Sequence, residues 1–253
     1  MMNRNDKNSP LGAGGMIFSA GLGTRFKPWT DKHPKALAVV NEKSLLQSNI
    51  EYLQRYGIKD VIVNVHHFAE QVTDAIKVNN GWGSNIIISD ERDELLDTGG
   101  GLLNAKHFFI PEQSFITCNA DILTDLDISK LISFHQQHKA LISFGVTDRK
   151  TSRYLLFDEN NRLCGWRNTG TKVEKISIQK QALRQMAYSC VVVFNYDLFR
   201  LIQEKGFKGK FSLIDVYLAL AHDHLIMGYD HTGDRLVDVG KPESIGVAQS
   251  LFY

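Results

Sequence analysis

The sequence predicts an α/β fold, with one domain in which a mixed, mostly parallel central sheet is flanked by helices. Over the first half of the chain, short apolar segments alternate with segments of helical spacing, a pattern typical of βαβ units. After residue 140 the pattern changes to short strands and turns, which indicates a smaller β-rich subregion. A length of 253 residues with 43% hydrophobic residues is enough for one large domain with a buried core, and two domains are the alternative.

The first half of the chain predicts four strands and four helices. The strands are expected at 15–19, 60–65, 85–88 and 114–118. The helices are expected from 44 to the glycine at 57, and at 69–77, 101–108 and 128–138. Pro28 and Pro34 forbid a continuous helix in the long loop after the first strand, because proline lacks an N–H and restricts the residue before it. That loop is therefore expected to be exposed.

The second half predicts shorter strands and three more helices. Strands are expected at 141–146, 153–157, 163–166, 173–178, 188–194, 226–229 and 235–239, with a hairpin turn at Asn160 and Asn161. Helices are expected at 196–205, at 213–222 and after Pro242. We expect residues 148–195 to form a β-rich subregion that faces the substrate, within a single domain of residues 13–253.

Composition excludes several classes of protein. The 29 basic and 28 acidic residues leave a net charge of +1, so no overall charge draws the chain to nucleic acid or to a membrane surface. Cys118, Cys164 and Cys190 are too widely spaced for a disulfide framework or a zinc site, which fits a reducing compartment. Residues 1–12 are polar and expected to be flexible, and no run of eighteen apolar residues indicates a membrane span or a signal peptide. We expect a soluble cytoplasmic protein, either a monomer or a dimer.

The loop after the first strand has the composition of a phosphate-binding loop. Gly21 and Gly23 lack side chains, so the backbone between them can reach positive φ and bring its N–H groups close to an anion. Arg25 and Lys35 add positive charge, since arginine binds oxygens in a bidentate manner and lysine acts as a mobile point charge. The expected ligand is a chain of phosphates.

Asp121 and Asp238 are the candidate metal ligands. Ligands of open parallel sheets bind beyond the carboxyl ends of the strands, and both aspartates lie at or just after the end of a predicted strand. Carboxylate oxygens suit Mg²⁺, which takes one or two carboxylates and completes its shell with water and substrate phosphates. The alternative is that each aspartate caps a turn or a helix.

The run DTGGG at residues 97–101 precedes a predicted helix at the same edge of the sheet. Consecutive glycines allow the backbone to approach a planar base or a sugar, and a helix that begins there directs its N–H groups at an anion. The alternative is a flexible surface turn. His66 and His67 follow the second strand and could contact substrate, although the alternative of a structural hydrogen-bonding role is open for both.

These motifs resemble the signature of the sugar-1-phosphate nucleotidyltransferases, G-x-G-T-R-x-x-P-x-T-x-x-x-P-K. Residues 21–35 match it in the segment GLGTRFKPWTDKHPK. The resemblance extends through residues 119–121 (NAD) and 238–240 (DVG) and covers nearly the whole chain. Within the family, the DTGGG run and the DVG segment are similar to those of short bacterial members such as the N-acetylmuramate 1-phosphate uridylyltransferases. The heptose and mannose 1-phosphate guanylyltransferases are near neighbours.

The resemblance implies a Rossmann-like nucleotidyltransferase fold in which a sugar 1-phosphate attacks the α-phosphorus of an NTP and releases pyrophosphate, with Mg²⁺ as the cofactor. It implies that Arg25 holds the triphosphate, that Lys35 neutralises charge near the reacting phosphates, and that Asp121 and Asp238 hold the metal. Nucleotide contacts are expected for Ala20, Gly21, Gly23, Thr24, Thr98, Gly99 and Asn119, and sugar contacts for Gly100, Asp125 and Asn195. Such a transfer depends on positioning and charge neutralisation, and the attacking phosphate is already ionised, so no general base is required.

The resemblance favours UTP as the nucleotide, with GTP as the alternative. Three positions depart from the family pattern: Ala36 replaces a common proline, Leu236 a common tryptophan and Cys190 a common glycine. The last two are candidates for altering the sugar pocket. Longer relatives add an acyltransferase or a regulatory region, and because this chain ends soon after residue 238 we expect a stand-alone transferase.

Two other classes of function agree less well with the sequence. A dinucleotide-dependent oxidoreductase would need a third glycine where Phe26 stands, and prolines follow where its helix should begin. A nucleotide-sugar sensor without turnover would not require the arginine, the lysine and both aspartates. Mg²⁺-dependent release of pyrophosphate separates an enzyme from such a sensor.

Overall fold

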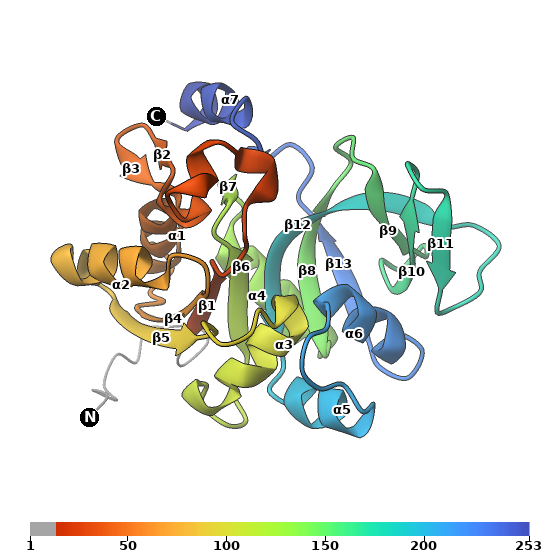
Figure 1. Ribbon diagram of the computed structural model, residues 1–253. Helices are drawn as coiled ribbons and strands as arrows, with labels where there is room; N and C mark the ends of the chain where they lie inside the picture. The colour runs from red at the N-terminus through yellow and green to blue at the C-terminus, as the bar shows by residue number, and fades with distance from the viewer. Residues whose placement is uncertain (1–13, 253) are drawn as a thin grey trace.

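A ten-stranded central sheet organises the chain in the computed structural model, which describes residues 14–252 (Figure 1). Its strands are β1 (Gly15–Phe18), β4 (Asp60–Val65), β5 (Asn85–Asp90), β6 (Phe115–Asn119), β8 (Ile142–Thr147), β9 (Arg153–Phe157), β10 (Leu163–Asn168), β11 (Val173–Ile176), β12 (Arg184–Phe194) and β13 (Ile226–Asp230). They follow the spatial order β11-β10-β9-β12-β6-β1-β4-β5, and β8 pairs with both β12 and β13. The predicted segment 1–12 lies outside the described residues.

The sheet is mixed, and three of its parallel pairs join strands from the first half of the chain. β1 pairs in parallel with β4 and β6, β4 with β5, and β8 with β13. β12 runs antiparallel to β6, β8 and β9. The predicted mixed, mostly parallel sheet is therefore confirmed. β12 begins four residues before the predicted strand at 188–194, because its first residues pair with β9 and its last with β6 and β8.

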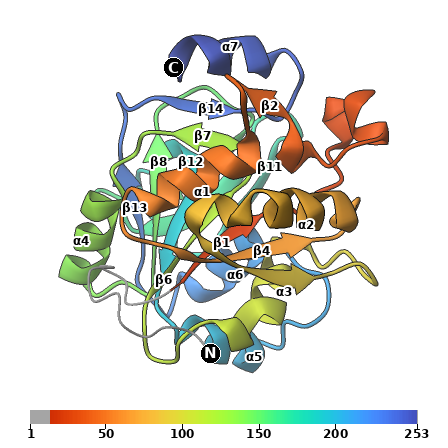
Figure 2. The same ribbon diagram turned by 90° about the vertical axis from the view of Figure 1, so that its left-hand side faces the viewer.

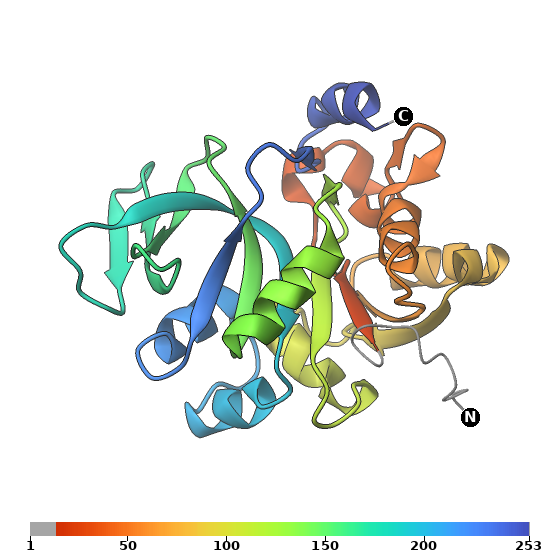
Figure 3. The ribbon, with the colours of Figure 1, turned by 180° about the vertical axis from the view of Figure 1, so that it is seen from behind.

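Helices cover both faces of the sheet. α1 (Leu45–Gln54), α2 (Ala69–Val78) and α4 (Ile128–His138) pack on one face, whereas α3 (Asp97–Asn104), α5 (Leu198–Glu204) and α6 (Leu213–Leu220) pack on the other. Figure 2 brings α1 and α2 to the front, and Figure 3 shows α4 from behind. Met16 and Ile17 are both fully buried, one in each of the two hydrophobic clusters, as the alternation of side chains along a strand requires.

Two small sheets lie outside the central one. β14 (Leu236–Asp238) pairs with β7 (Ile122–Thr124), and β2 (Val39–Val40) pairs with β3 (Lys43–Ser44). The C-terminal helix α7 (Ser244–Leu251) packs against β2 at the top of Figure 1. A third hydrophobic cluster, which includes Phe26, Leu123 and Val239, joins these pieces to the loop after β1. The strand at 235–239 was predicted, whereas its partner β7 was not.

The antiparallel strands β9, β10 and β11 extend to the right of the sheet in Figure 1. The predicted turn between β9 and β10 is confirmed: Asn161 has φ 61, and its N–H donates to the Asp158 carbonyl at 3.2 Å. The limits of a single domain at 13–253 and of its substrate-facing part at 148–195 stay predictions. Within residues 14–252, no helix has the length and apolar character needed to cross a membrane.

Candidate active site

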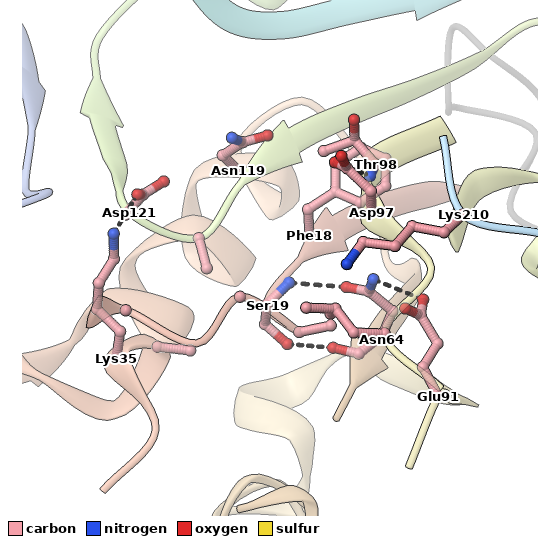
Figure 4. Close-up of a pocket in the computed structure, with 16 residues that line it drawn as sticks. Phe18, Ser19, Lys35, Asn64, Glu91, Asp97, Thr98, Asn119, Asp121 and Lys210 are labelled. Atoms are coloured by element: carbon pink, nitrogen blue, oxygen red, sulfur yellow. Dashed lines mark hydrogen bonds and ion pairs between the residues drawn. The ribbon is translucent and has the colours of Figure 1, made fainter. Parts of the chain in front are cut away.

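A pocket of about 370 Å³ opens at the carboxyl ends of β1, β4, β5 and β6 (Figure 4). Residues predicted to bind nucleotide, phosphate or metal line it, namely Ala20, Gly21, Gly23, Lys35, Thr98, Asn119 and Asp121. Five other residues predicted for the site do not line the pocket. Thr24, Arg25, Gly99 and Gly100 follow within two positions of a lining residue, and Asp238 pairs with Ile122, which follows Asp121. The fold thus brings segments from four parts of the chain to one edge of the sheet.

The loop after β1 is shaped by one glycine and two prolines. It forms three short 3-10 turns, η1 (Thr24–Phe26), η2 (Trp29–Asp31) and η3 (Lys35–Leu37), in place of a continuous helix. Gly23 has φ 60, and a Cβ atom there would lie 2.9 Å from Thr30 Cγ2 and 3.1 Å from Lys35 Cβ. The Thr30 hydroxyl donates to the Gly23 carbonyl at 2.9 Å. Gly23 therefore serves both the turn and the close approach of Lys35.

Lys35 and Asp121 form an ion pair at one end of the pocket, and Figure 4 shows their side chains pointing toward each other. The two side chains are 15% and 22% exposed, so a ligand in the pocket can reach them. The Val239 N–H donates to the Asp121 carbonyl at 2.8 Å, and in the β7–β14 ladder Asp238 stands opposite Ile122. The two predicted metal ligands thus lie on adjacent backbone segments.

Arg25 and Asp238 both approach Gly240. A Cβ atom on Gly240 would lie 2.7 Å from Asp238 Oδ1 and 2.9 Å from Arg25 Nη2. Both side chains therefore use the space that the missing side chain of Gly240 leaves free. Asp238 lies on β14, which pairs with β7 next to Asp121.

The DTGGG run forms the first turns of α3, which begins four residues before the predicted helix. The Gly99 and Gly100 N–H groups both donate to the Phe211 carbonyl, at 2.9 and 3.2 Å. A Cβ atom on Gly99 would lie 2.4 Å from the Phe211 ring, and one on Gly100 would lie 2.2 Å from the Gly209 carbonyl oxygen. These glycines are buried and allow the loop between α5 and α6 to pack on α3, which differs from a flexible surface turn.

Two residues predicted to bind the sugar lie away from the pocket. Asp125 forms an ion pair with Arg235 at 2.6 Å and also accepts the Arg235 backbone N–H at 2.7 Å. Asn195 follows Phe194, which pairs with Phe115 at the amino end of β6, whereas the pocket lies at the carboxyl end of that strand. The structure does not bring these two side chains to the other predicted site residues.

A buried polar network at the floor of the pocket contains none of the residues predicted for the site from the sequence. Asn64 accepts the Ser19 N–H on Oδ1 at 2.7 Å and donates from Nδ2 to Glu91 Oε1 at 2.8 Å. Asn64 and Glu91 are each 3% exposed. Burial raises the pKa of the Glu91 carboxyl, and the hydrogen bond from Asn64 opposes that shift. The network ties together the ends of β1, β4 and β5.

Sequence signals existed for part of this network. Asn64 interrupts the apolar run of β4, and Glu91 directly follows β5, which ends two residues beyond the predicted end at 88. Ligands of open parallel sheets bind beyond the carboxyl ends of the strands, and this expectation applies to Glu91 after β5 as it does to Asp121 after β6. Lys210, which lines the same pocket, comes from the loop between α5 and α6, and no local pattern indicates that placement.

Cys190 occupies a backbone conformation that favours glycine. Its φ is 58, and the pairing of β12 with β8 shifts register between Tyr188 and Val192. Glycine reaches positive φ at no steric cost, unlike cysteine. Burial raises the pKa of the Cys190 thiol, and the negative charges of Asp121 and Asp238 add to this shift, so the thiol is held in its neutral form.

Comparison with known proteins identifies a family and similar sequences. A family model described as Nucleotidyl transferase matches residues 14–251. N-acetylmuramate alpha-1-phosphate uridylyltransferase of Caulobacter vibrioides is 40% identical over 92 residues, 36% of this chain and 38% of that protein. Mannose-1-phosphate guanylyltransferase catalytic subunit beta of Drosophila pseudoobscura pseudoobscura is 27% identical over 252 residues, 97% of this chain and 64% of that protein. The chain thus spans less than two thirds of the length of either relative.

A solved structure shows the same fold. HddC from Yersinia pseudotuberculosis, complexed with GMP-PN, superposes with a TM-score of 0.76 and 21% identity, over 95% of this chain and 100% of that one. At this identity the likeness establishes the fold alone. Since the family model covers nearly the whole chain, and the glycine loop, its lysine and the aspartate after β6 line one pocket, the chain belongs to the nucleotidyl transferase family.

Proposed function

We propose that the protein transfers the nucleotidyl group of an NTP to a sugar 1-phosphate. A phosphate oxygen of the sugar 1-phosphate forms a bond to the α-phosphorus of the NTP, the bond from that phosphorus to the α–β bridging oxygen breaks, and pyrophosphate leaves. The observation that carries the proposal is the pocket in which the Lys35–Asp121 ion pair lies beside the Gly21–Gly23 loop. Its volume of about 370 Å³ suits a small-molecule ligand.

The positive side chains would bind and orient the phosphates. Arg25 follows the glycine loop and approaches Gly240, and its guanidinium would make bidentate contact with phosphate oxygens. Lys35 stands at the pocket wall as a point charge and would neutralise charge near the reacting phosphates. Neither residue needs to accept a proton, because the attacking oxygen is already ionised.

The donor set at this end of the pocket fits Mg²⁺. Asp121 and Asp238 supply two carboxylates from adjacent backbone segments, and Mg²⁺ takes one or two carboxylates together with substrate phosphates and water. Within residues 14–252 no three His, Cys, Asp or Glu side chains gather around a metal position, so the substrate phosphates would complete the shell. Bound there, Mg²⁺ would neutralise phosphate charge and orient the phosphate chain.

UTP is the proposed nucleotide, with an N-acetylated or related hexose 1-phosphate as the acceptor. The support is the 40% identity to a uridylyltransferase, which covers 36% of this chain. GTP is the second candidate, because a guanylyltransferase is similar along 97% of the chain and a protein of the same fold binds GMP-PN. We propose that the reaction takes place in the cytoplasm.

A substrate panel tests the proposal. Four NTPs are crossed with hexose, heptose and N-acetylated hexose 1-phosphates, and pyrophosphate release is measured with and without Mg²⁺. The proposal expects release with at least one pair, dependent on Mg²⁺, and the largest rate with UTP. If nucleotide sugars bind but no pair releases pyrophosphate, the protein is a nucleotide-sugar sensor and the proposal is wrong.

A further inference from the structure

The pocket has a second charged end, remote from the phosphate-binding residues. Figure 4 shows Lys210 and Glu91 on the side of the pocket opposite Lys35 and Asp121. Of the charged residues assigned above to the phosphates and the metal, Lys35 and Asp121 line the pocket, and they lie at its other end. Because the base and the phosphates occupy opposite ends of a nucleotide, the base would lie between Lys210 and Glu91.

The loop that carries Lys210 is fixed directly after this residue. The Phe211 N–H donates to the Leu96 carbonyl at 3.2 Å, the Phe211 carbonyl accepts from Gly99 at 2.9 Å, and the Leu213 N–H donates to Thr98 Oγ1 at 3.1 Å. The glycine run of α3 thus has a second consequence, since it lets this loop come close enough to direct Lys210 into the pocket. Within residues 14–252, no hydrogen bond or ion pair holds the Lys210 ammonium, so its donors are available to a ligand.

Glu91 offers acceptor capacity at the same end. Its Oε1 accepts from Asn64 at 2.8 Å, and its Oε2 accepts only a long bond of 3.5 Å from the Leu96 N–H. Each carboxylate oxygen can accept two hydrogen bonds, and no lysine or arginine pairs with Glu91 within the described part of the chain. A carboxylate that is 3% exposed and only partly bonded is stabilised by a ligand that donates to it.

We infer that Lys210 and Glu91 select an oxo base, one in which a carbonyl stands next to a ring N–H, as in uracil and guanine. This inference rests on the proposed function and narrows its substrate class. The Lys210 ammonium donates to the base carbonyl (O4 of uracil or O6 of guanine), and Glu91 accepts from the adjacent ring N–H. Cytosine and adenine present an amino group and an unprotonated ring nitrogen at these positions, so their donors would face the ammonium and their lone pair the carboxylate.

The selection should be strong because a mismatched base would direct a lone pair at the buried Glu91 carboxylate and leave it without a donor. Sites built to hydrogen-bond a substrate group reject analogues that lack it much more strongly than apolar pockets reject a change in size. We expect UTP or GTP to bind at least about 100-fold more tightly than CTP and ATP.

Calorimetric binding of the four NTPs to the full chain in the presence of Mg²⁺ tests this without turnover. Lys210→Met keeps an unbranched side chain of similar length and removes its donors, whereas Lys208→Met changes an exposed lysine on the same loop that does not line the pocket. We expect Lys210→Met to weaken UTP and GTP binding about 10- to 100-fold, with CTP and ATP little changed. Lys208→Met should match the wild type.

Glu91→Gln is a second variant, and it tests the contact between residue 91 and the ring nitrogen of the base. A glutamine can still accept from Asn64 while its amide donates to the ring nitrogen of cytosine. The ratio of UTP to CTP affinity should therefore fall at least about tenfold. The melting temperature of each variant shows that the fold is retained.

Three results would overturn the inference. If the wild type binds CTP or ATP more tightly than UTP and GTP, Lys210 and Glu91 do not select the base in the way inferred here. If Lys210→Met weakens all four NTPs equally, Lys210 contacts the phosphates or the ribose instead of the base. In either of these two cases, Mg²⁺-dependent turnover would leave the proposed function standing. The third result, the absence of any NTP binding, would overturn both proposals.

Discussion

Lys35 and Asp121 form an ion pair although 86 positions separate them in the chain. Lys35 belongs to the loop after β1, and Asp121 follows β6, which pairs directly with β1. The pair joins the loop that we propose binds phosphate to the first candidate metal ligand. It therefore marks the end of the pocket at which we place the reacting phosphates.

Lys35→Ala should reduce turnover much more than stability. Loss of a positioned charge at a reacting phosphate lowers kcat by about 100- to 1,000-fold, whereas a partly exposed ion pair contributes about 1 kcal/mol or less to the free energy of unfolding. Steady-state kinetics and thermal unfolding of the same samples measure both. Lys32→Ala, an exposed lysine of the same loop that does not line the pocket, should behave as wild type. An unfolded Lys35→Ala protein would indicate a structural role.

Gly240→Ala should disturb Arg25 and Asp238 together. The added Cβ atom would lie 2.7 Å from Asp238 Oδ1 and 2.9 Å from Arg25 Nη2, closer than such atoms approach in folded proteins. Because a displacement of about 1 Å in a catalytic group can lower a rate by about 100-fold, we expect a loss of that order in kcat/KM. The Mg²⁺ concentration needed for half-maximal rate should also rise. Unchanged kinetics would show that this pair takes no part in the reaction.

Two glycine substitutions should change stability in opposite directions. Gly99→Ala places a Cβ atom 2.4 Å from the Phe211 ring, and such overpacking lowers the free energy of unfolding by about 1–3 kcal/mol. Gly246→Ala in α7 meets nothing within 4 Å, and alanine in a helix raises the free energy of unfolding by about 0.5–1 kcal/mol. Denaturant titrations of both variants provide the comparison. Equal effects would mean that α3 and the loop between α5 and α6 pack loosely.

Acid should weaken the fold partly through His135. Burial lowers the pKa of His135 from 6.5 to about 4, and its Nδ1 lies 3.0 Å from Ser143 Oγ. Between these two pH values the unfolded chain binds more protons than the folded one, so stability is complete above 6.5 and falls as the pH drops toward 4. The full effect of such a shift is about 3 kcal/mol.

His135→Gln should therefore flatten the dependence of unfolding free energy on pH in that window. Urea titrations of wild type and variant at pH 4 to 7 measure the difference between their slopes. Parallel curves would show that His135 protonates equally in the folded and unfolded chains.

The central sheet could be predicted from sequence because its strands are short, apolar and separated by helices of clear spacing. β4, with its run of apolar residues, and α4 match their predicted bounds. The glycine loop and Asp121 could also be found, since side chains after parallel strands gather at one edge. β7 was missed because three residues carry no periodicity of their own and form a strand only against β14.

The opposite end of the pocket could not be predicted, because it depends on contacts between distant segments. The sequence predicts that the glycine run of α3 approaches the ligand, and it gives no sign that the Phe211 ring and the Gly209 carbonyl also pack against Gly99 and Gly100. Lys210 enters the pocket only through that packing. Asn195 is predicted to bind the sugar, but it follows β12. Because β12 runs antiparallel to β6, it ends at the amino end of β6, opposite the pocket.

The path of a label at the α-phosphorus of the NTP tests the central claim most directly. The wild type, given α-labelled UTP or GTP, an accepted sugar 1-phosphate and Mg²⁺, should place the label in the nucleotide sugar and release unlabelled pyrophosphate. Asp121→Asn, which keeps the size of the side chain and removes its charge, should lower this transfer at least about 100-fold while its melting temperature stays close to that of the wild type. Label recovered in free nucleotide, or full transfer by Asp121→Asn at saturating Mg²⁺, would contradict the assignment of this pocket.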